Sequence, residues 1–405
     1  MLDTPSTVWT DAPIAVGTPD TRSPSGFRLA CERIVLRDRV IAGSIDIENG
    51  RITAVHAAPA KDGVSAVACD GLTLIPGIID VHTDHVETHV HPRSTVQWQF
   101  LPALMAHDGV VISGGTTTVF DSLCVGASMK RPERREILEP LVEALEHGQT
   151  SGMFRADHLL HLRCEISDPD TMPLTDAIIG KAMTRLVSVM DHTPGDRQSP
   201  NVERWFNHMI HEMEITPQEG RERMDELFER SARVGAAVRA HVVGAAKSHG
   251  ITLMSHDDRS VEHVELAKRE GVDVSEFPTT LEAAHQARAF DIANIAGAPN
   301  YVRGGSQSGN VAVKELLAEG LVDAFASDYV PRSLLDAAFK LAHDTELPHD
   351  LPQAISLVSD APARLTGLED RGRIEAGLRA DLVAIREVEG QPQVAAVWRE
   401  GARVF

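Results

Sequence analysis

The sequence predicts an α/β protein: a (β/α)8 TIM-like barrel with a small β-sandwich domain formed by both chain ends. Eight β-rich runs alternate with helix-patterned stretches over about 250 residues in the centre of the chain, as such a barrel requires. Short alternating runs with turn signals occupy the two ends. A doubly wound sheet is the alternative, but no Gly-x-Gly-x-x-Gly motif follows the first central strand.

The two ends of the chain show the same sequence pattern of short strands joined by turns. Residues 33–36 and 44–55 alternate apolar and polar side chains, and Asn49-Gly50 within the second run is a strong hairpin signal. Residues 381–385 and 394–398 repeat this pattern. The sequence therefore predicts a small β-sandwich domain from 28–72 and 366–405, with residues 1–27 as a disordered tail rather than a signal peptide.

The central segment, 73–365, is predicted to form the barrel. Helices are expected at 219–234 and 311–319, where apolar residues recur at helical spacing. The eight predicted strands are 77–84, 116–121, 158–165, 186–192, 251–256, 272–277, 292–297 and 321–328.

Composition excludes several classes of protein. The 405 residues carry 39 Lys+Arg against 59 Asp+Glu, and this charge of −20 argues against a broad nucleic-acid surface. No stretch approaches the ~20 apolar residues that span a bilayer. The four cysteines are scattered, so neither a disulfide framework nor a zinc knuckle is expected, and the cytoplasm is the predicted compartment.

Five of the predicted strands end on side chains that bind metals or transfer protons. Active sites of parallel barrels lie at the carboxyl ends of the strands, so these side chains are expected to meet. The predicted metal-binding residues are His82, Asp84, Glu165, His192, His256 and Asp328.

Each residue type fits that chemistry. Alternation along a strand puts His82 and Asp84 on one face. Imidazole nitrogens suit zinc, manganese or iron. Glu165 is expected to bind one metal or bridge two, although a salt bridge with Arg163 is the alternative. Asp328 is the predicted catalytic residue, a general base for water activated by the metal, with a helix cap as the alternative.

A rival metal set follows the first central strand. His85, Glu87, His89 and His91 share a parity, but they lie beyond the apolar run and before Pro92. A polar loop is the alternative interpretation of this segment.

A glycine- and serine-rich segment, 303–310, is a candidate anion site. Glycines allow close approach to a ligand, backbone N–H groups and hydroxyls hold anions, and a helix is expected near Val311. A plain flexible loop is the alternative. The predicted phosphate-binding residues are Arg303, Gly304, Gly305, Ser306, Ser308, Arg197 and Arg93.

Two segments resemble the amidohydrolase superfamily: 76–84 its first-strand signature and 377–383 its closing motif. The closer resemblance is to the diphosphatase branch of the carbon–phosphorus lyase pathway, and it covers nearly everything from about residue 28 to 405. Its motifs are 82–85, 161–165, 190–195, 255–258, 276–280, 297–300, 303–306, 327–329 and 333–339.

The resemblance implies a barrel with a β-sandwich and a divalent metal ion, with zinc as the expected metal, one or two per chain. One departure is Asp84, because most amidohydrolases have His at this second position of His-x-His. The usual carbamylated lysine has no obvious counterpart here, and Glu165 is the expected substitute.

The implied reaction is hydrolysis of alpha-D-ribose 1-methylphosphonate 5-triphosphate to the 5-phosphate and diphosphate, in phosphonate catabolism. The implied partner is this small phosphonate substrate, with no nucleic acid and no membrane; a homo-oligomer stays open. The alternative is an amidohydrolase acting on a C–N bond of a cyclic amide or nucleobase-like substrate. A non-enzymatic sugar-phosphate binding protein and a subunit of a phosphonate-processing assembly also stay open.

Overall fold

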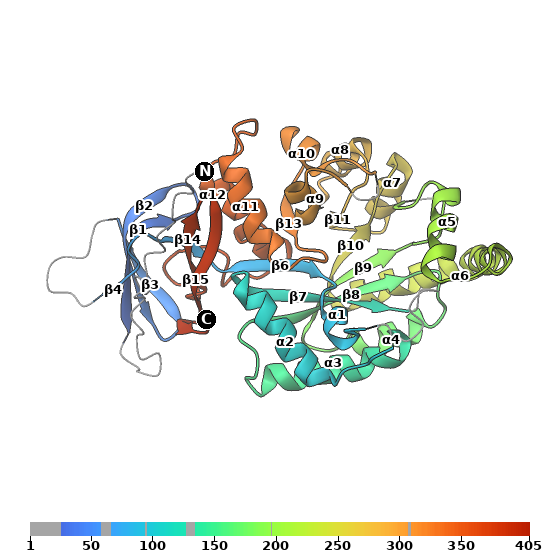
Figure 1. Ribbon diagram of the computed structural model, residues 1–405, viewed down its shortest axis with the longest axis horizontal. Coiled ribbons are helices and arrows are strands. Elements are labelled where there is room, and N and C mark those ends of the chain that lie inside the picture. Colours follow the sequence, from blue (N-terminus) through green and yellow to red (C-terminus); the bar gives the residue numbers. More distant parts are fainter. Residues whose placement is uncertain (1–25, 58–65, 94, 127–133, 196, 307–308) are drawn as a thin grey trace, which may run out of the picture.

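The computed structural model describes residues 26–57, 66–93, 95–126, 134–195, 197–306 and 309–405. Eight parallel strands follow one another around the barrel in chain order (Figure 1). A backbone bridge between Thr83 and Asp328 links the first strand to the end of the last. The strands are β6 (Ile78–Thr83), β7 (Thr116–Val125), β8 (Asp157–Glu165), β9 (Thr184–Met190), β10 (Thr252–His256), β11 (Val274–Glu276), β12 (Ala293–Gly297) and β13 (Ala324–Ala326).

All eight predicted barrel strands are present. β6 and β7 are buried at every position, as expected for parallel strands covered on both faces. Helices surround the strands, and their apolar sides complete the core. They are α1 (Val86–Val90), α2 (Phe100–Ser113), α3 (Arg134–Thr150), α4 (Thr171–Ile178), α5 (Val202–Glu212), α6 (Pro217–His249), α7 (Val261–Arg269), α8 (Leu281–Ala289), α9 (Ala298–Arg303), α10 (Val313–Ala318), α11 (Ser333–His343), α12 (Leu351–Ser356) and α13 (Asp360–Leu365).

The helix predicted at 219–234 is part of the much longer α6. Thr216 and Glu219 form a capping box at its start, and Pro217 occupies its first turn. The helix continues for 33 residues and ends at Gly250, whose φ of 64° lies in the left-handed region. Among the described residues, none of the helices combines the length and the apolar character that a bilayer crossing requires.

The two chain ends form one mixed sheet beside the barrel (Figure 1). Its order is β16-β15-β14-β5-β1-β2-β3, with β4 next to β1. The predicted hairpin is present: Asn49 and Gly50 both have positive φ, 50° and 76°, as a type I′ turn requires. The strands are β1 (Phe27–Val35), β2 (Val40–Glu48), β3 (Arg51–His56), β4 (Val67–Ala68), β5 (Thr73–Pro76), β14 (Leu382–Val388), β15 (Gln391–Arg399) and β16 (Ala402–Arg403).

This sheet buries its own core, with Ile34, Leu74 and Trp398 fully enclosed. The exact division at 28–72, 73–365 and 366–405 stays a prediction, and nearly all of the predicted tail lies outside the described residues.

Candidate active site

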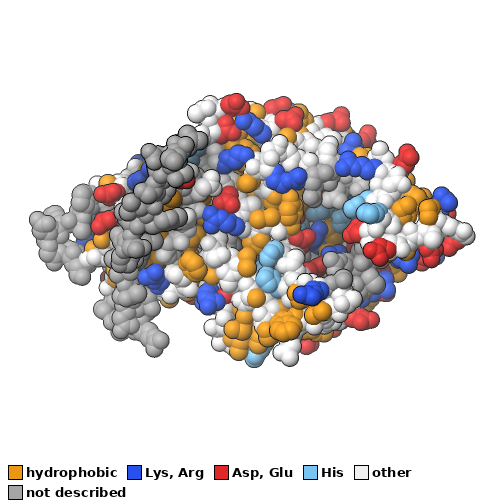
Figure 2. Space-filling model, in the orientation of Figure 1, with side chains coloured by type: hydrophobic (Ala, Val, Ile, Leu, Met, Phe, Trp, Pro, Cys, Tyr) orange, Lys and Arg blue, Asp and Glu red, His pale blue; other side chains and the backbone are white. Residues whose placement is uncertain are grey.

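A cavity of about 350 Å³ lies at the carboxyl ends of the barrel strands. Five of the six predicted metal-binding residues line it. Figure 2 shows acidic, basic and histidine side chains reaching the surface around the middle of this face. The five residues are Asp84, Glu165, His192, His256 and Asp328.

The sixth residue, His82, is fully buried next to the cavity. Its ring is stacked near that of His256, with centroids 5.9 Å apart, and the ring centroid of His192 also lies 5.9 Å from that of His256. The three histidines come from β6, β10 and the segment after β9. The fold therefore gathers imidazoles that are far apart in the sequence.

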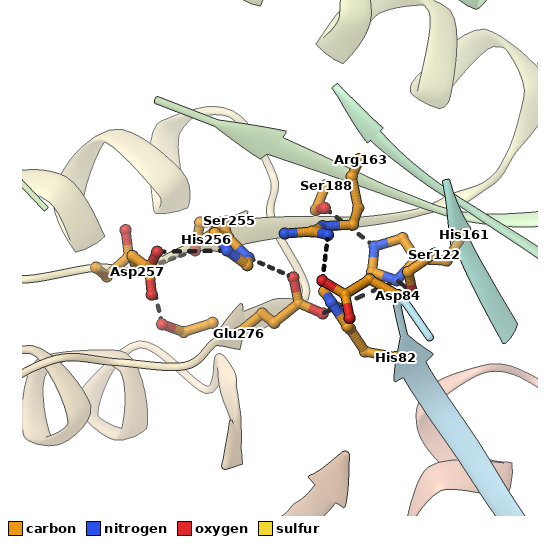
Figure 3. A network of polar contacts seen from close by, with 12 residues as sticks. His82, Asp84, Ser122, His161, Arg163, Ser188, Ser255, His256, Asp257 and Glu276 are labelled. Carbon is orange, nitrogen blue, oxygen red and sulfur yellow. Dashed lines mark hydrogen bonds and ion pairs between the residues drawn. The ribbon is translucent and has the colours of Figure 1, made fainter. Parts of the chain in front are cut away.

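One carboxylate, Glu276 at the end of β11, orients two of these rings (Figure 3). Its oxygens lie 2.5 Å from Nδ1 of His82 and 2.6 Å from Nδ1 of His256. Burial alone would raise the pKa of Glu276, but the histidines His82, His161 and His256 hold it well below its usual value. Glu276 is therefore a carboxylate, and when it accepts the Nδ1 protons, the Nε2 atoms become free to bind an ion.

Asp328 is fixed by the first strand. Its N–H donates to the carbonyl of His82 at 2.9 Å, and its own carbonyl accepts from the N–H of Asp84 at 3.1 Å. This closure holds Asp328 in the left-handed region, with φ of 56°. Burial, together with the nearby Asp84 carboxylate, raises the pKa of Asp328 to about 6, which suits a proton acceptor working near neutral pH.

Glu165 does not pair with Arg163. Its carboxylate lies 2.7 Å from Nδ1 of His192 and accepts from the Ser167 hydroxyl at 2.9 Å. Arg163 instead lies 3.3 Å from the Asp84 carboxylate (Figure 3). A local salt bridge therefore does not account for Glu165, which stays available at the cavity wall.

The donor set fits a divalent metal ion. Nε2 of His82 is buried and has no hydrogen-bond partner among the described residues, and Oδ2 of Asp257 is buried 3.3 Å from Nε2 of His256 (Figure 3). One ligand atom from each of His192, His256 and Asp257 lies within 4.8 Å of the others. Such imidazole nitrogens and carboxylate oxygens suit zinc, manganese or iron.

A second hollow, of about 100 Å³, adjoins the first. Arg303 and Ser306 from the predicted anion loop line it. The two hollows share Gln198, Phe277, Asp328 and Tyr329. The loop therefore lies beside the metal-type cluster and opens onto the same Asp328.

The loop has the backbone that its glycines predict. Gly304 follows α9 with φ of 85°, and Gly305 has φ of 158°. The helix expected near Val311 begins at Val313 and is only six residues long, so a helix dipole adds little here. Ser308 lies outside the described residues.

The other two predicted phosphate-binding arginines are outside the described lining of both hollows. Arg197 is buried, and it donates to the carbonyl of His256 at 2.8 Å and to the Asp258 carboxylate at 2.9 Å. It therefore holds the loop after β10 in place. Arg93 is exposed in the segment after α1, outside the described lining of both hollows.

Sequence reasoning missed three residues of the site. Glu276 is the last residue of β11 but only the penultimate residue of the predicted strand 272–277, so the strand-end signal fell on Phe277 instead. His161 shares its strand parity with Arg163 and Glu165, and its ring lies 5.2 Å from that of His82. Arg230 of α6 lines the main cavity, but nothing distinguishes it among the many charged residues of that helix.

An eight-stranded parallel barrel with imidazoles and carboxylates gathered at one mouth is the architecture of the amidohydrolases. The comparisons agree. The model of the Amidohydrolase family matches residues 202–405. The alpha-D-ribose 1-methylphosphonate 5-triphosphate diphosphatase of Escherichia coli (strain K12) is 39% identical over 373 residues, which cover 92% of this chain and 98% of that protein. The chain belongs to the amidohydrolase family.

Solved structures share the fold at low sequence identity. The N-acetyl-D-glucosamine-6-phosphate deacetylase of Mycobacterium smegmatis superposes with a TM-score of 0.62 at 15% identity, covering 94% of this chain and 100% of that one. The dihydropyrimidinase of Brevibacillus agri NCHU1002 has a TM-score of 0.58 at 12% identity, covering 94% and 95%. These likenesses support the barrel and its attached sheet.

Proposed function

We propose that this protein hydrolyses alpha-D-ribose 1-methylphosphonate 5-triphosphate to alpha-D-ribose 1-methylphosphonate 5-phosphate and diphosphate, in phosphonate catabolism. The observation that carries the proposal is that the metal-type cluster and the Arg303 hollow share Asp328 and Tyr329. The diphosphatase named above, 39% identical, supports the choice of substrate.

The cavity walls supply the ligands for a divalent ion, for which we propose zinc, one or two per chain. When bound, the ion would supply Lewis acidity toward phosphoryl oxygens and make water a stronger acid. Glu276 would fix the ring orientation of His82 and His256. The proposed ligands are His82, Asp84, Glu165, His192, His256 and Asp328.

Asp328 would accept the proton. The water oxygen bonds to one phosphorus of the bridge between the α- and β-phosphoryl groups, and the bond from that phosphorus to the bridging oxygen breaks. Diphosphate leaves while the 5-phosphate stays on ribose. One proton of that water goes to the Asp328 carboxylate, which the backbone of β6 holds at the mouth.

The substrate's negative charge needs local cations on a chain with a net charge of −20. Arg163 and Arg230 line the main cavity, and Arg303 lines the adjoining hollow. A triphosphate lying between the hollows would contact cations at both ends and have Asp328 in between. Charge-assisted hydrogen bonds of this kind are the strong ones.

The first test follows diphosphate release by phosphorus NMR with protein stripped of metal, and then with Zn²⁺ restored. Activity should disappear on stripping and return with the ion. Asp328→Asn should lower kcat by about 10²- to 10⁴-fold. Turnover of a cyclic amide without diphosphate release would reject the proposal in favour of C–N bond hydrolysis.

The second test addresses the anion loop. Arg303→Ala should raise KM about 10- to 100-fold, since hydrogen bonds to charged groups contribute roughly 1.5–3 kcal/mol. Arg269→Ala is the matched control, because that side chain is exposed and its one ion pair within the described part of the chain is with Glu265, at 4.0 Å. Equal KM values for the two variants would remove Arg303 from the phosphate site.

Three finer points are also proposals. We propose a cytoplasmic protein that binds no nucleic acid and no membrane, and that forms a homo-oligomer. Elemental analysis would give the number and identity of the metal ions, and the mass in solution would give the oligomeric state.

A further inference from the structure

A second histidine cluster lies where α1 packs against α2, outside the described lining of the active-site cavity. His85 is the N-cap residue of α1 and His89 lies four residues further along, within the helix. His107 lies on α2, which packs against α1 (Figure 1). Histidines at this spacing share one face of a helix. The ring centroids lie 5.0 Å apart for His85 and His89, and 5.9 Å from each of these to His107.

A carboxylate determines which nitrogen of His107 is free. Nε2 of His107 lies 2.8 Å from Asp121 of β7, and both side chains are fully buried. The Asp121 carboxylate accepts the Nε2 proton, so Nδ1 of His107 keeps its lone pair. Carboxylates hold metal-binding histidines in this way.

The free nitrogens converge. Nδ1 of His85, Nε2 of His89 and Nδ1 of His107 are buried atoms without a hydrogen-bond partner among the described residues. One ring nitrogen from each histidine lies within 4.8 Å of the others. A buried polar atom that stays unpaired is costly, and three in one place require a common partner.

The Asp121 carboxylate behind His107 also lies 2.7 Å from Nδ1 of His158, so both of its oxygens are held by histidine rings.

We propose that His85, His89 and His107 form a second metal site, which takes a divalent ion of the zinc type and leaves a fourth position for water. The ion would tie α1 to α2. Because α1 has only five residues and begins two residues after Asp84, such a tie would steady the corner that carries Asp84. The site does not depend on the reaction proposed above.

The test removes the active-site ligands first. In a His192→Ala/His256→Ala background, the full chain is stripped with a chelator and titrated with Co²⁺ and then Zn²⁺. We expect one ion per chain by elemental analysis, visible absorption typical of nitrogen-bound Co²⁺, and a zinc-dependent rise in Tm.

Adding His89→Ala to this background should abolish the absorption and the rise in Tm, and His85→Ala should do the same. These two variants are preferred to His107→Ala, which would leave the buried Asp121 short of a partner. The matched control is His147→Ala, which removes an exposed imidazole from α3. Absence of the ion from the background, or its retention in the His89→Ala and His85→Ala variants, would overturn the proposal.

Discussion

Glu276 shows how one buried residue organises a site. It lies 194 residues from His82 in the sequence, yet its carboxylate contacts the Nδ1 atoms of both His82 and His256. Both rings must then present Nε2 outward. The orientation of two candidate ligands therefore depends on a residue that need not touch the ion or the substrate.

We expect Glu276→Gln to weaken metal retention about 10- to 100-fold, which is typical for loss of a residue that orients metal ligands. An amide has only one acceptor oxygen, and its NH₂ group cannot accept the second Nδ1 proton. Competition with a chelator, followed by elemental analysis, measures this loss. Glu265→Gln on the exposed face of α7 is the control, and equal retention by both variants would contradict the assigned role.

At the scale of elements, two glycines near the C-terminal end of α6 distinguish the effect of backbone strain from the effect of packing. An added Cβ would meet nothing within 4 Å at either Gly250 or Gly244. Gly250 follows the helix in the left-handed region, whereas Gly244 lies inside the helix. The two glycines therefore differ in φ but not in available space.

Gly250→Ala should destabilise the protein by about 1 kcal/mol, because an L-residue with a Cβ is strained in the left-handed region. Gly244→Ala should stabilise it by about 0.5–1 kcal/mol, since alanine loses less entropy within a helix. Urea unfolding followed by circular dichroism gives both values. Changes of the same sign at the two positions would show that the helix does not end as described.

The sequence predicts helices and strands better than it predicts which side chains contact one another in the fold. Apolar runs and alternation identify all eight barrel strands, because these signals are local. Arg163 is different: it is two residues from Glu165, but it pairs with Asp84, 79 residues away. Strand register and barrel curvature decide which inward side chains meet, and neither is encoded in the residues next to Arg163. The predicted helix 219–234 is shorter than α6, because the many charged residues of α6 hide its apolar periodicity.

At the scale of the whole molecule, one carboxylate joins the barrel to the mixed sheet. Asp157 begins β8, and it lies 2.6 Å from Arg371, 2.7 Å from Arg379 and 2.8 Å from Arg399 of β15. Burial alone would raise the pKa of Asp157, but the three arginines hold it below its usual value. The carboxylate therefore stays charged and neutralises a cluster of cations.

Asp157→Asn should destabilise the protein by about 3 kcal/mol at pH 7, because three guanidinium groups would face one another without their shared anion.

The pH dependence of this stability difference has a definite sign. Since folding lowers the pKa of Asp157, its contribution is fully present above the ordinary value of 3.8 and is lost as the pH falls below it. The difference between wild type and variant in urea unfolding should therefore be constant from pH 7 to 5 and should shrink below pH 4. Asp176→Asn is the control, since Asp176 is 58% exposed and, among the described residues, pairs with His241 alone. It should change stability by no more than ~0.5 kcal/mol. A variant of Asp157 that unfolds at the wild-type midpoint at pH 7 would show that this carboxylate does not hold the sheet to the barrel.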